Sequence, residues 1–398
     1  MTEMPISSNS DRLSNFDFTR HNAEVKELWA AFNAWQPTPR IPIILGSSTR
    51  YFMFNRAANP DVIDFRRYSE NPDVMVDAQL QFQRWRKFNL LQDEDLGLPD
   101  KWSITPDFQN YFEAAWFGCR IHYFPDQVPD TMPDFADAPE RVMEKGIPDP
   151  FGGLLARALA YWEHFQARAS KETFLGRPIE AVLPPWGLCG FDGVMTVACN
   201  LFSAEFVCET MADDPERLNR LLDFITEATI LRVAAWRKLA GIPVPQDAFG
   251  LADDSIALIS TAMYREHILP YHRRLCEALA GSGPRFIHLC GDSTRHFRAL
   301  RDELNIRSFD TGFPVDFAAL RRELGTDVRI QGGPHVHFLI QATPVEVREE
   351  VRRILQSGVL EGGFFVLREG NNLAPGTPLE NTEALYHAGR EFGQRISS

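Results

Sequence analysis

The segment RFIHLCGD, residues 285–292, shows the pattern that decides the fold of this chain. It is a short, mainly apolar run that ends at Gly-Asp, which is typical of a buried strand. Side chains alternate along a strand, so His288 and Cys290 lie on one face while Ile287 and Leu289 lie on the other. The apolar pair suits a covering layer of helices, which places the histidine and the cysteine in the lumen of a barrel.

Seven further runs of the same kind are spread along the chain. They are IPIILG (41–46), KFNLLQD (87–93), IEAVLPPWG (179–187), DAFGLADD (247–254), IRSFDTG (306–312), VRIQGGP (328–334) and GFFVLREGN (363–371). Eight such strands alternating with helices predict an α/β fold, a (β/α)₈ barrel of the TIM type. A doubly wound sheet is the alternative, but no Gly-x-Gly-x-x-Gly follows the first run.

Helix starts lie between the later strands. Thr343-Pro-Val-Glu346 and Thr377-Pro-Leu-Glu380 each combine an N-cap threonine, a proline at the first helical position and a capping-box glutamate. Asp214-Pro215 opens a third helix in the same manner.

The 398 residues suit one large domain as well as two, since α/β barrels often reach this size. We expect a single barrel over 41–398, preceded by an N-terminal lead-in at 1–40. The Pro- and Asp-rich stretch 124–153 is predicted to be a long surface excursion from that barrel.

Composition excludes several classes of function. The formal net charge of −13 disfavours nucleic acid as the main partner, because phosphate binding needs a basic surface. No apolar run of about 18 residues and no signal-like N-terminus is seen, so we expect a cytoplasmic protein without a membrane. The six cysteines are too scattered for a disulfide framework. A homodimer is the default expectation for its assembly.

Active sites of such barrels lie at the C-terminal ends of the strands, so the residues at these ends are the candidates. We expect Arg50, Asp253 and Asp254 to act in catalysis. The candidates for binding a substrate are Arg50, Tyr51, Trp186, Asp310, His335 and Asn371. Arg50 is chosen because a guanidinium group binds carboxylates or phosphates in a bidentate manner.

His288 and Cys290 are two residues apart on one face of a strand, and such a pair can bind one zinc ion. A catalytic zinc needs a third ligand, for which Glu369 is the first candidate and Asp253 or Asp254 the next. The alternative is that the pair only fills the lumen. The aspartates have an alternative too, since either could cap the following helix.

The C-terminal half resembles the uroporphyrinogen decarboxylase superfamily, most closely from about residue 245 onward. The resemblance rests on HLCGD, on the long stretch ending in RIQGGP, on ATPVEVREEVRRIL and on GGFFVLREGNNLAPGTPLEN. It implies a TIM-type barrel. The family's decarboxylases carry Arg-Gln-Ala-Gly-Arg-Tyr after the first strand, whereas GSSTRY here keeps Arg50 and Tyr51 but lacks the first arginine.

The resemblance is closer to the corrinoid-dependent methyltransferase branch, such as the methylcobamide:coenzyme M methyltransferases. Those enzymes bind zinc through His-x-Cys-Gly and a later cysteine in Gly-Cys-Gly, and His288 and Cys290 match the first two ligands. Asn371 stands where the third would be. The implied function is methyl transfer between a thiol or methoxy compound and a corrinoid. The corrinoid would arrive free or on a carrier protein, because this chain has no corrinoid-binding Asp-x-His-x-x-Gly segment.

Two other functions stay open from the sequence. One is a metal-independent decarboxylase, in which Arg50 binds a substrate carboxylate and Asp93 or Asp253 stabilises a protonated intermediate. The other is a barrel that binds a corrinoid or tetrapyrrole without catalysis.

Overall fold

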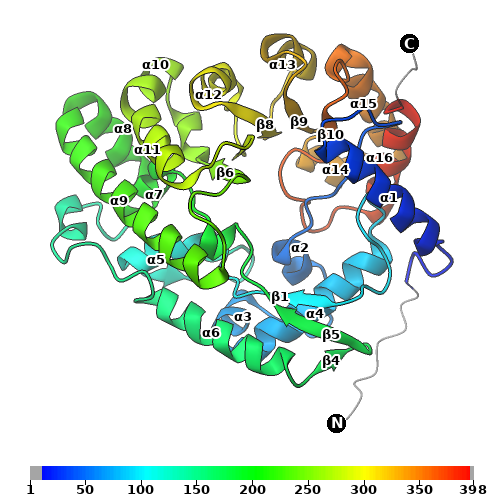
Figure 1. The fold of residues 1–398 in the computed structure, drawn as a ribbon, viewed down its shortest axis with the longest axis horizontal. Helices are drawn as coiled ribbons and strands as arrows, with labels where there is room; N and C mark the ends of the chain where they lie inside the picture. The colour runs from blue at the N-terminus through cyan, green and yellow to red at the C-terminus, as the bar shows by residue number, and fades with distance from the viewer. Residues whose placement is uncertain (1–10, 395–398) are drawn as a thin grey trace.

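The computed structural model describes residues 11–394, and Figure 1 shows helices surrounding a central set of strands. Five parallel strands form the main sheet in the order β10-β9-β8-β7-β6. Their bounds are β6 Phe249–Ala252, β7 Arg285–Leu289, β8 Ile306–Thr311, β9 Arg329–Gly332 and β10 Phe365–Leu367. These five correspond to the last five predicted strands.

A smaller sheet has the order β1-β5-β4. β1 (Trp102–Ile104) pairs in parallel with β5 (Arg177–Ala181), which pairs antiparallel with β4 (Thr173–Phe174). The remaining two strands, β2 (Ile121–His122) and β3 (Asp130–Thr131), form a short hairpin at the start of the predicted surface excursion.

The first predicted strand, 41–46, extends the edge of the main sheet. Ile43 forms a parallel bridge with Leu367, and Ile44 N donates to the Leu367 carbonyl at 3.0 Å. The prediction of a strand at 87–93 is wrong, because helix α4 continues through Asn89. The strand that follows it is β1, whose three residues are too few to show a pattern.

Helices cover the outside of the strands in Figure 1. Their bounds are α1 Phe18–Asn33, α2 Thr49–Phe54, α3 Phe65–Glu70, α4 Pro72–Asn89, α5 Phe112–Phe117, α6 Leu154–Ala169, α7 Val194–Phe202, α8 Ala204–Asp213, α9 Pro215–Ala240, α10 Thr261–Met263, α11 Leu269–Leu279, α12 Phe297–Leu304, α13 Phe317–Leu324, α14 Val336–Gln341, α15 Pro344–Ile354 and α16 Leu379–Phe392. Helix α1 lies within the predicted lead-in 1–40, of which residues 1–10 fall outside the described residues.

Two of the three predicted helix starts are confirmed. Thr343 caps α15 in a full capping box with Glu346, and Asp214 caps α9 by accepting from the backbone N–H of Arg217. The third prediction is wrong. Helix α16 begins at Leu379, and the Thr377 hydroxyl donates back to the Ala374 carbonyl instead of capping the helix.

The two faces of the main sheet differ as the alternation predicts. Ile287, Leu289 and Ile330 are buried on the side of the helix layer. On the opposite face, Ser308 and Gln331 are only half-buried. The lumen side of these strands therefore carries the polar residues, among them the predicted metal-binding pair.

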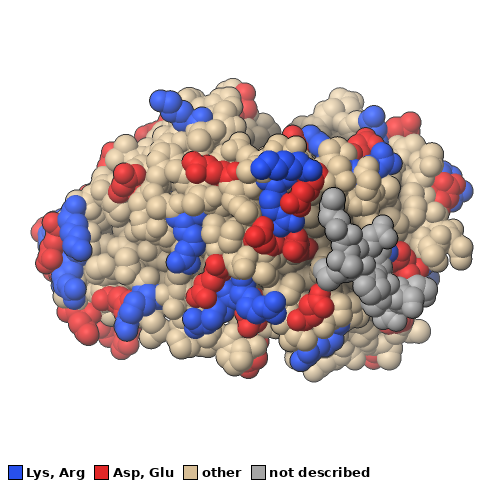
Figure 2. Space-filling view, turned by 90° about the horizontal axis from the view of Figure 1, so that it is seen from below, with Lys and Arg blue, Asp and Glu red and all other residues tan. Residues whose placement is uncertain are grey.

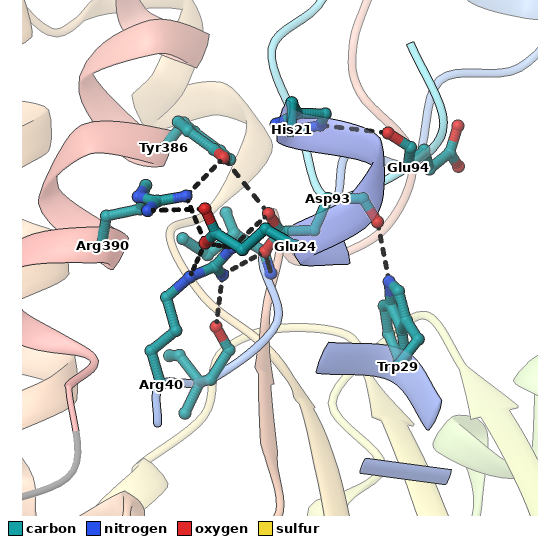
Figure 3. A network of polar contacts seen from close by, with 10 residues as sticks. His21, Glu24, Trp29, Arg40, Asp93, Glu94, Tyr386 and Arg390 are labelled. Atoms are coloured by element: carbon teal, nitrogen blue, oxygen red, sulfur yellow. Dashed lines mark hydrogen bonds and ion pairs between the residues drawn. The ribbon is translucent and has the colours of Figure 1, made fainter. Parts of the chain in front are cut away.

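A buried polar network near the N-terminus ties the ends of the chain together (Figure 3). Arg40 binds both carboxylate oxygens of Asp93, at 2.5 and 2.9 Å, and also binds Glu24. Asp93 accepts further from Ile43 N at 2.7 Å and from the Tyr386 hydroxyl at 3.2 Å. Because its oxygens are all engaged and it is fully buried, Asp93 holds the fold and does not face a substrate.

The surface in Figure 2 intermixes acidic and basic side chains among the described residues. Between residues 11 and 394, no single helix has the length and hydropathy needed to cross a membrane. Helices α7 and α8 pass that test only together, as a pair bent by 109°.

Candidate metal centre

His288 and Cys290 lie at the end of β7, as the sequence predicts. The His288 Nε2 atom lies 3.0 Å from the Cys290 Sγ atom. Asp254, which follows β6, accepts a hydrogen bond from the Cys290 backbone N–H at 2.7 Å. In the described part of the chain, the ligand atoms of these three residues lie within 4.8 Å of one another.

Asp310 on the neighbouring strand β8 orients the histidine. His288 Nδ1 donates to Asp310 Oδ2 at 2.7 Å, and the same oxygen accepts from Arg368 Nη1 at 2.8 Å. Burial lowers the pKa of His288, but the hydrogen bonds to Asp310 and Cys290 outweigh it and raise the pKa to about 11. A carboxylate on one imidazole nitrogen is the usual support for a histidine that binds metal through the other.

Asn371 completes the surroundings of the cysteine. Cys290 Sγ donates to Asn371 Oδ1 at 3.3 Å, so Asn371, a residue predicted to bind a substrate, lies beside the pair. Its backbone has a φ of 114°, a conformation that a non-glycine residue seldom adopts and that accumulates at functional sites. Burial raises the pKa of the Cys290 thiol, and His288 opposes this effect.

The donor set fits a zinc ion. One imidazole nitrogen, one thiol sulfur and one carboxylate oxygen are the three ligand types that zinc accepts, and a catalytic site needs three protein ligands. The carboxylate of Asp310, which fixes the orientation of the imidazole, is also in place.

Glu369, the first sequence candidate for the third ligand, lies outside this group of three. It is fully buried, and its Oε1 accepts from Gly46 N at 2.6 Å beside the Arg368 guanidinium. Burial raises the pKa of Glu369 to about 7. The structure instead brings Asp254 to the pair, which was the second choice from the sequence.

Asp253 is buried in a network that organises helix α7. Its carboxylate accepts from the N–H groups of Met195 and Thr196 at 3.1 and 2.8 Å and contacts His272 Nε2 at 2.9 Å. This arrangement matches a capping role, although the helix that it caps is α7 and not the one that follows in sequence. It leaves no oxygen for the expected role in catalysis, so Asp254 is the better candidate of the two.

A cavity of about 980 Å³ opens beside the pair and extends along the lumen. Arg50, Trp186 and His288 all line it, so the structure brings these predicted residues together. Within residues 11–394, the side chain of Arg50 donates to the neutral amides of Gln109 and Asn110, each at 3.0 Å, and forms no ion pair. Trp186 is 69% exposed at the mouth.

Two predicted substrate-binding residues take other positions. Tyr51 is fully buried, with its ring packed on Trp85, and belongs to the core. His335 accepts from His337 N at the start of α14 and packs against Phe313. Neither side chain lines the described cavity.

The sequence reasoning missed Asp192, which lines the same cavity as His288. Burial, followed by the nearby charge of Glu113, raises its pKa well above the usual range of an aspartate. The Asp192 backbone N–H donates to Glu113 Oε2 at 2.6 Å, and Arg232 in turn binds Glu113. The available signal was the short motif GFDG, in which glycines flank the acid.

These features define an α/β barrel with a histidine–cysteine–carboxylate cluster at the C-terminal ends of its strands. Residues 25–392 match the uroporphyrinogen decarboxylase (URO-D) family, and the chain belongs to that family.

The proteins that are similar to this chain include a methyltransferase and a decarboxylase. The chain is 29% identical over 305 residues to the methylated-thiol–coenzyme M methyltransferase of Methanosarcina mazei, which covers 73% of this chain and 72% of that protein. It is 24% identical over 379 residues to the uroporphyrinogen decarboxylase of Xanthomonas euvesicatoria pv. vesicatoria, covering 90% of this chain and 96% of that one. These relatives are enzymes.

A solved methyltransferase from Methanosarcina mazei superimposes with a TM-score of 0.61 at 20% identity. The match covers 92% of this chain and 98% of the other. This likeness confirms the predicted TIM-type barrel.

Proposed function

We propose that the protein is a methyltransferase that moves a methyl group between a small thiol or methoxy compound and a corrinoid, at a zinc site formed by His288, Cys290 and Asp254. The observation that carries this proposal is the 3.0 Å contact between His288 Nε2 and Cys290 Sγ, with Asp254 within 4.8 Å. The methyltransferase among the relatives supports the same reaction class.

When bound, zinc supplies a Lewis acid that keeps a substrate thiol deprotonated or polarises a methoxy oxygen. The chain's own residues position the reactants around it. Asp310 fixes the imidazole of His288 so that Nε2 faces the site. Trp186 and Arg50 line the route by which a substrate enters. Asp192 lines the same cavity as His288, and burial raises its pKa, so its carboxyl group is the candidate proton donor to a leaving oxygen or sulfur.

The set of ligands favours a methoxy substrate. A carboxylate and an asparagine surround Cys290 where the related methyltransferases have a second cysteine. A thiolate donates more charge to a metal than the carboxylate oxygen of Asp254 does, so a metal held by one thiolate and one carboxylate keeps more of its Lewis acidity than one held by two thiolates. The corrinoid would be supplied free or by a carrier protein.

The test combines metal binding with turnover. Purified protein loaded with Co²⁺ should show a sulfur-to-cobalt charge-transfer absorption that Cys290→Ser removes, while Cys208→Ser on α8 leaves it intact. The loaded zinc form should convert reduced cobalamin to methylcobalamin with a methoxy-aromatic donor. Absence of the charge-transfer band in the unmodified protein would refute the metal site.

A second function, decarboxylation without a metal, is favoured by Arg50, which lines the cavity and whose partners in the described part of the chain are neutral amides. A free guanidinium charge at this position suits a substrate carboxylate. The decarboxylases among the relatives support this alternative. A decarboxylase without a metal keeps its activity in the presence of a metal chelator, whereas the proposed methyltransferase loses its activity under the same conditions.

A further inference from the structure

The cavity beside His288 continues down the lumen instead of ending at the metal centre. Its walls include Gly250, Phe286, Ser308 and Gln331 from four consecutive strands of the main sheet. In barrels of this type, large branched side chains normally fill such positions. A Cβ added to Gly250 would meet only Phe286 Cδ1, at 3.5 Å, so the lumen has space at this level.

Arg329 on β9 is the cation of this lower part of the cavity. Its Nη2 donates to the Phe32 carbonyl at 2.7 Å and its Nη1 to Asn33 Oδ1 at 3.4 Å, at the end of helix α1. The guanidinium lies over the ring of Trp35, 4.3 Å from its centroid. Its Nε is buried without a hydrogen-bond partner. Among residues 11–394, no carboxylate lies within ion-pair distance of it.

Three acidic residues line the cavity, Asp107, Asp192 and Asp247, and the first and last of them have other partners. Asp107 accepts from the Tyr68 hydroxyl at 2.9 Å, and Asp247 accepts from Ser282 N at 3.0 Å. Neither forms an ion pair with Arg329 in the described structure. A partly buried cation without a counter-charge is costly, and an anionic ligand would remove that cost.

The register of the sheet gives the distance from Arg329 to the metal centre. Arg329 pairs with Ser308, which pairs with Phe286, two residues before His288 on β7. The two Cα atoms are therefore two strands apart and two residues apart along the strand direction, which corresponds to about 12 Å. The side chains of both residues stand on the lumen face and line the same cavity of about 980 Å³, which has room for an aromatic ring between them.

We propose that Arg329 binds the carboxylate of an aromatic acid whose ring lies in the lumen against Phe286, with its opposite substituent at the His288–Cys290 pair. The substrate of the proposed methyltransferase is then a methoxy-substituted aromatic carboxylic acid. This assignment rests on the proposed function only for the reaction that follows binding. Binding of the acid itself requires Arg329 and the open lumen but no metal.

Binding of 4-methoxybenzoate and of uncharged methoxybenzene to the full chain, measured by titration calorimetry, tests this proposal. Ser308→Asp places a carboxylate beside Arg329 and leaves the arginine's contacts with α1 in place. Ser308→Asn is the control of equal size. We expect 4-methoxybenzoate to bind more tightly than methoxybenzene, and Ser308→Asp to weaken its binding at least about tenfold while Ser308→Asn does not.

Arg329→Gln should weaken binding of the acid in the same way, with circular dichroism and a melting curve to show that the variant is folded. Equal binding by Ser308→Asp and Ser308→Asn would overturn the proposal. So would loss of binding in Arg50→Gln alone, because the carboxylate would then lie at the mouth. The titration is made without metal, so a negative result refutes binding of the acid and not the proposed methyl transfer. The Co²⁺ test addresses the metal site of the proposed reaction separately.

Discussion

Replacing Asp310 with asparagine should loosen metal binding without unfolding the barrel. In the native site, Asp310 Oδ2 accepts from both His288 Nδ1, at 2.7 Å, and Arg368 Nη1, at 2.8 Å. Asparagine has the same shape, but its acceptor oxygen is uncharged, so its hydrogen bonds to His288 and Arg368 are weaker than those of the carboxylate. The imidazole is then held less firmly in the orientation that binds metal.

Loss of such an outer-sphere partner lowers metal affinity about 10- to 100-fold, which corresponds to roughly 1.4 to 2.7 kcal/mol. Competition with a chromophoric chelator measures this affinity for Zn²⁺ at constant pH. Asp327→Asn is the matched control, because Asp327 pairs only with Arg307 at the surface. Unchanged Zn²⁺ affinity in a folded Asp310→Asn protein would show that His288 does not bind metal through Nε2.

Three further predictions concern stability and can be checked by chemical denaturation. Asp93→Ala leaves the buried Arg40 guanidinium without its partner and should reduce the free energy of unfolding by about 3–5 kcal/mol; a loss below about 1 kcal/mol would contradict the role of this network. Gly193→Ala drives a Cβ into the side chain of Asp253 and should cost about 1–3 kcal/mol, whereas Gly250→Ala, with its nearest atom at 3.5 Å, should be tolerated. Burial lowers the pKa of His296 from 6.5 to about 4, so the folded state favours the neutral ring. Stability should therefore be complete above about pH 6.5 and fall as the pH drops toward 4, and His296→Gln should reduce that dependence.

The C-terminal half of the fold could be predicted from sequence because its strands are short apolar runs that end in glycine or a polar residue. The clean alternation of β7 is enough to place His288 on the lumen face, whereas β8 alternates less regularly and its pairing with β7 shifts register near Arg285. The N-terminal half has weaker signals. The run at 87–93 begins in the last turn of the amphipathic helix α4 and continues into the apolar Leu90 and Leu91 beyond it, and β1 has only three residues.

Only part of the candidate metal centre could be predicted from the sequence, because alternation relates residues on one strand but not residues on different strands. Two ligands on one strand share a face by simple alternation, so His288 and Cys290 could be paired from spacing alone. The proposed third ligand follows another strand, and the two neighbouring candidates differ in the direction in which the loop turns each side chain. Asp253 and Asp254 are adjacent in sequence, yet one turns inward to helix α7 and the other turns toward Cys290. Asp192 could not be found in this way because its raised pKa comes from burial in the fold and from the charge of Glu113, which is far away in the sequence.

The most direct test of the metal centre is the zinc content of the purified protein, measured by elemental analysis without added metal. The account predicts close to one zinc per chain, lost in Cys290→Ala and in Asp254→Ala and retained in Cys208→Ala. Zinc at the same level in the Cys290 and Asp254 variants, or none in the unmodified protein, would contradict it.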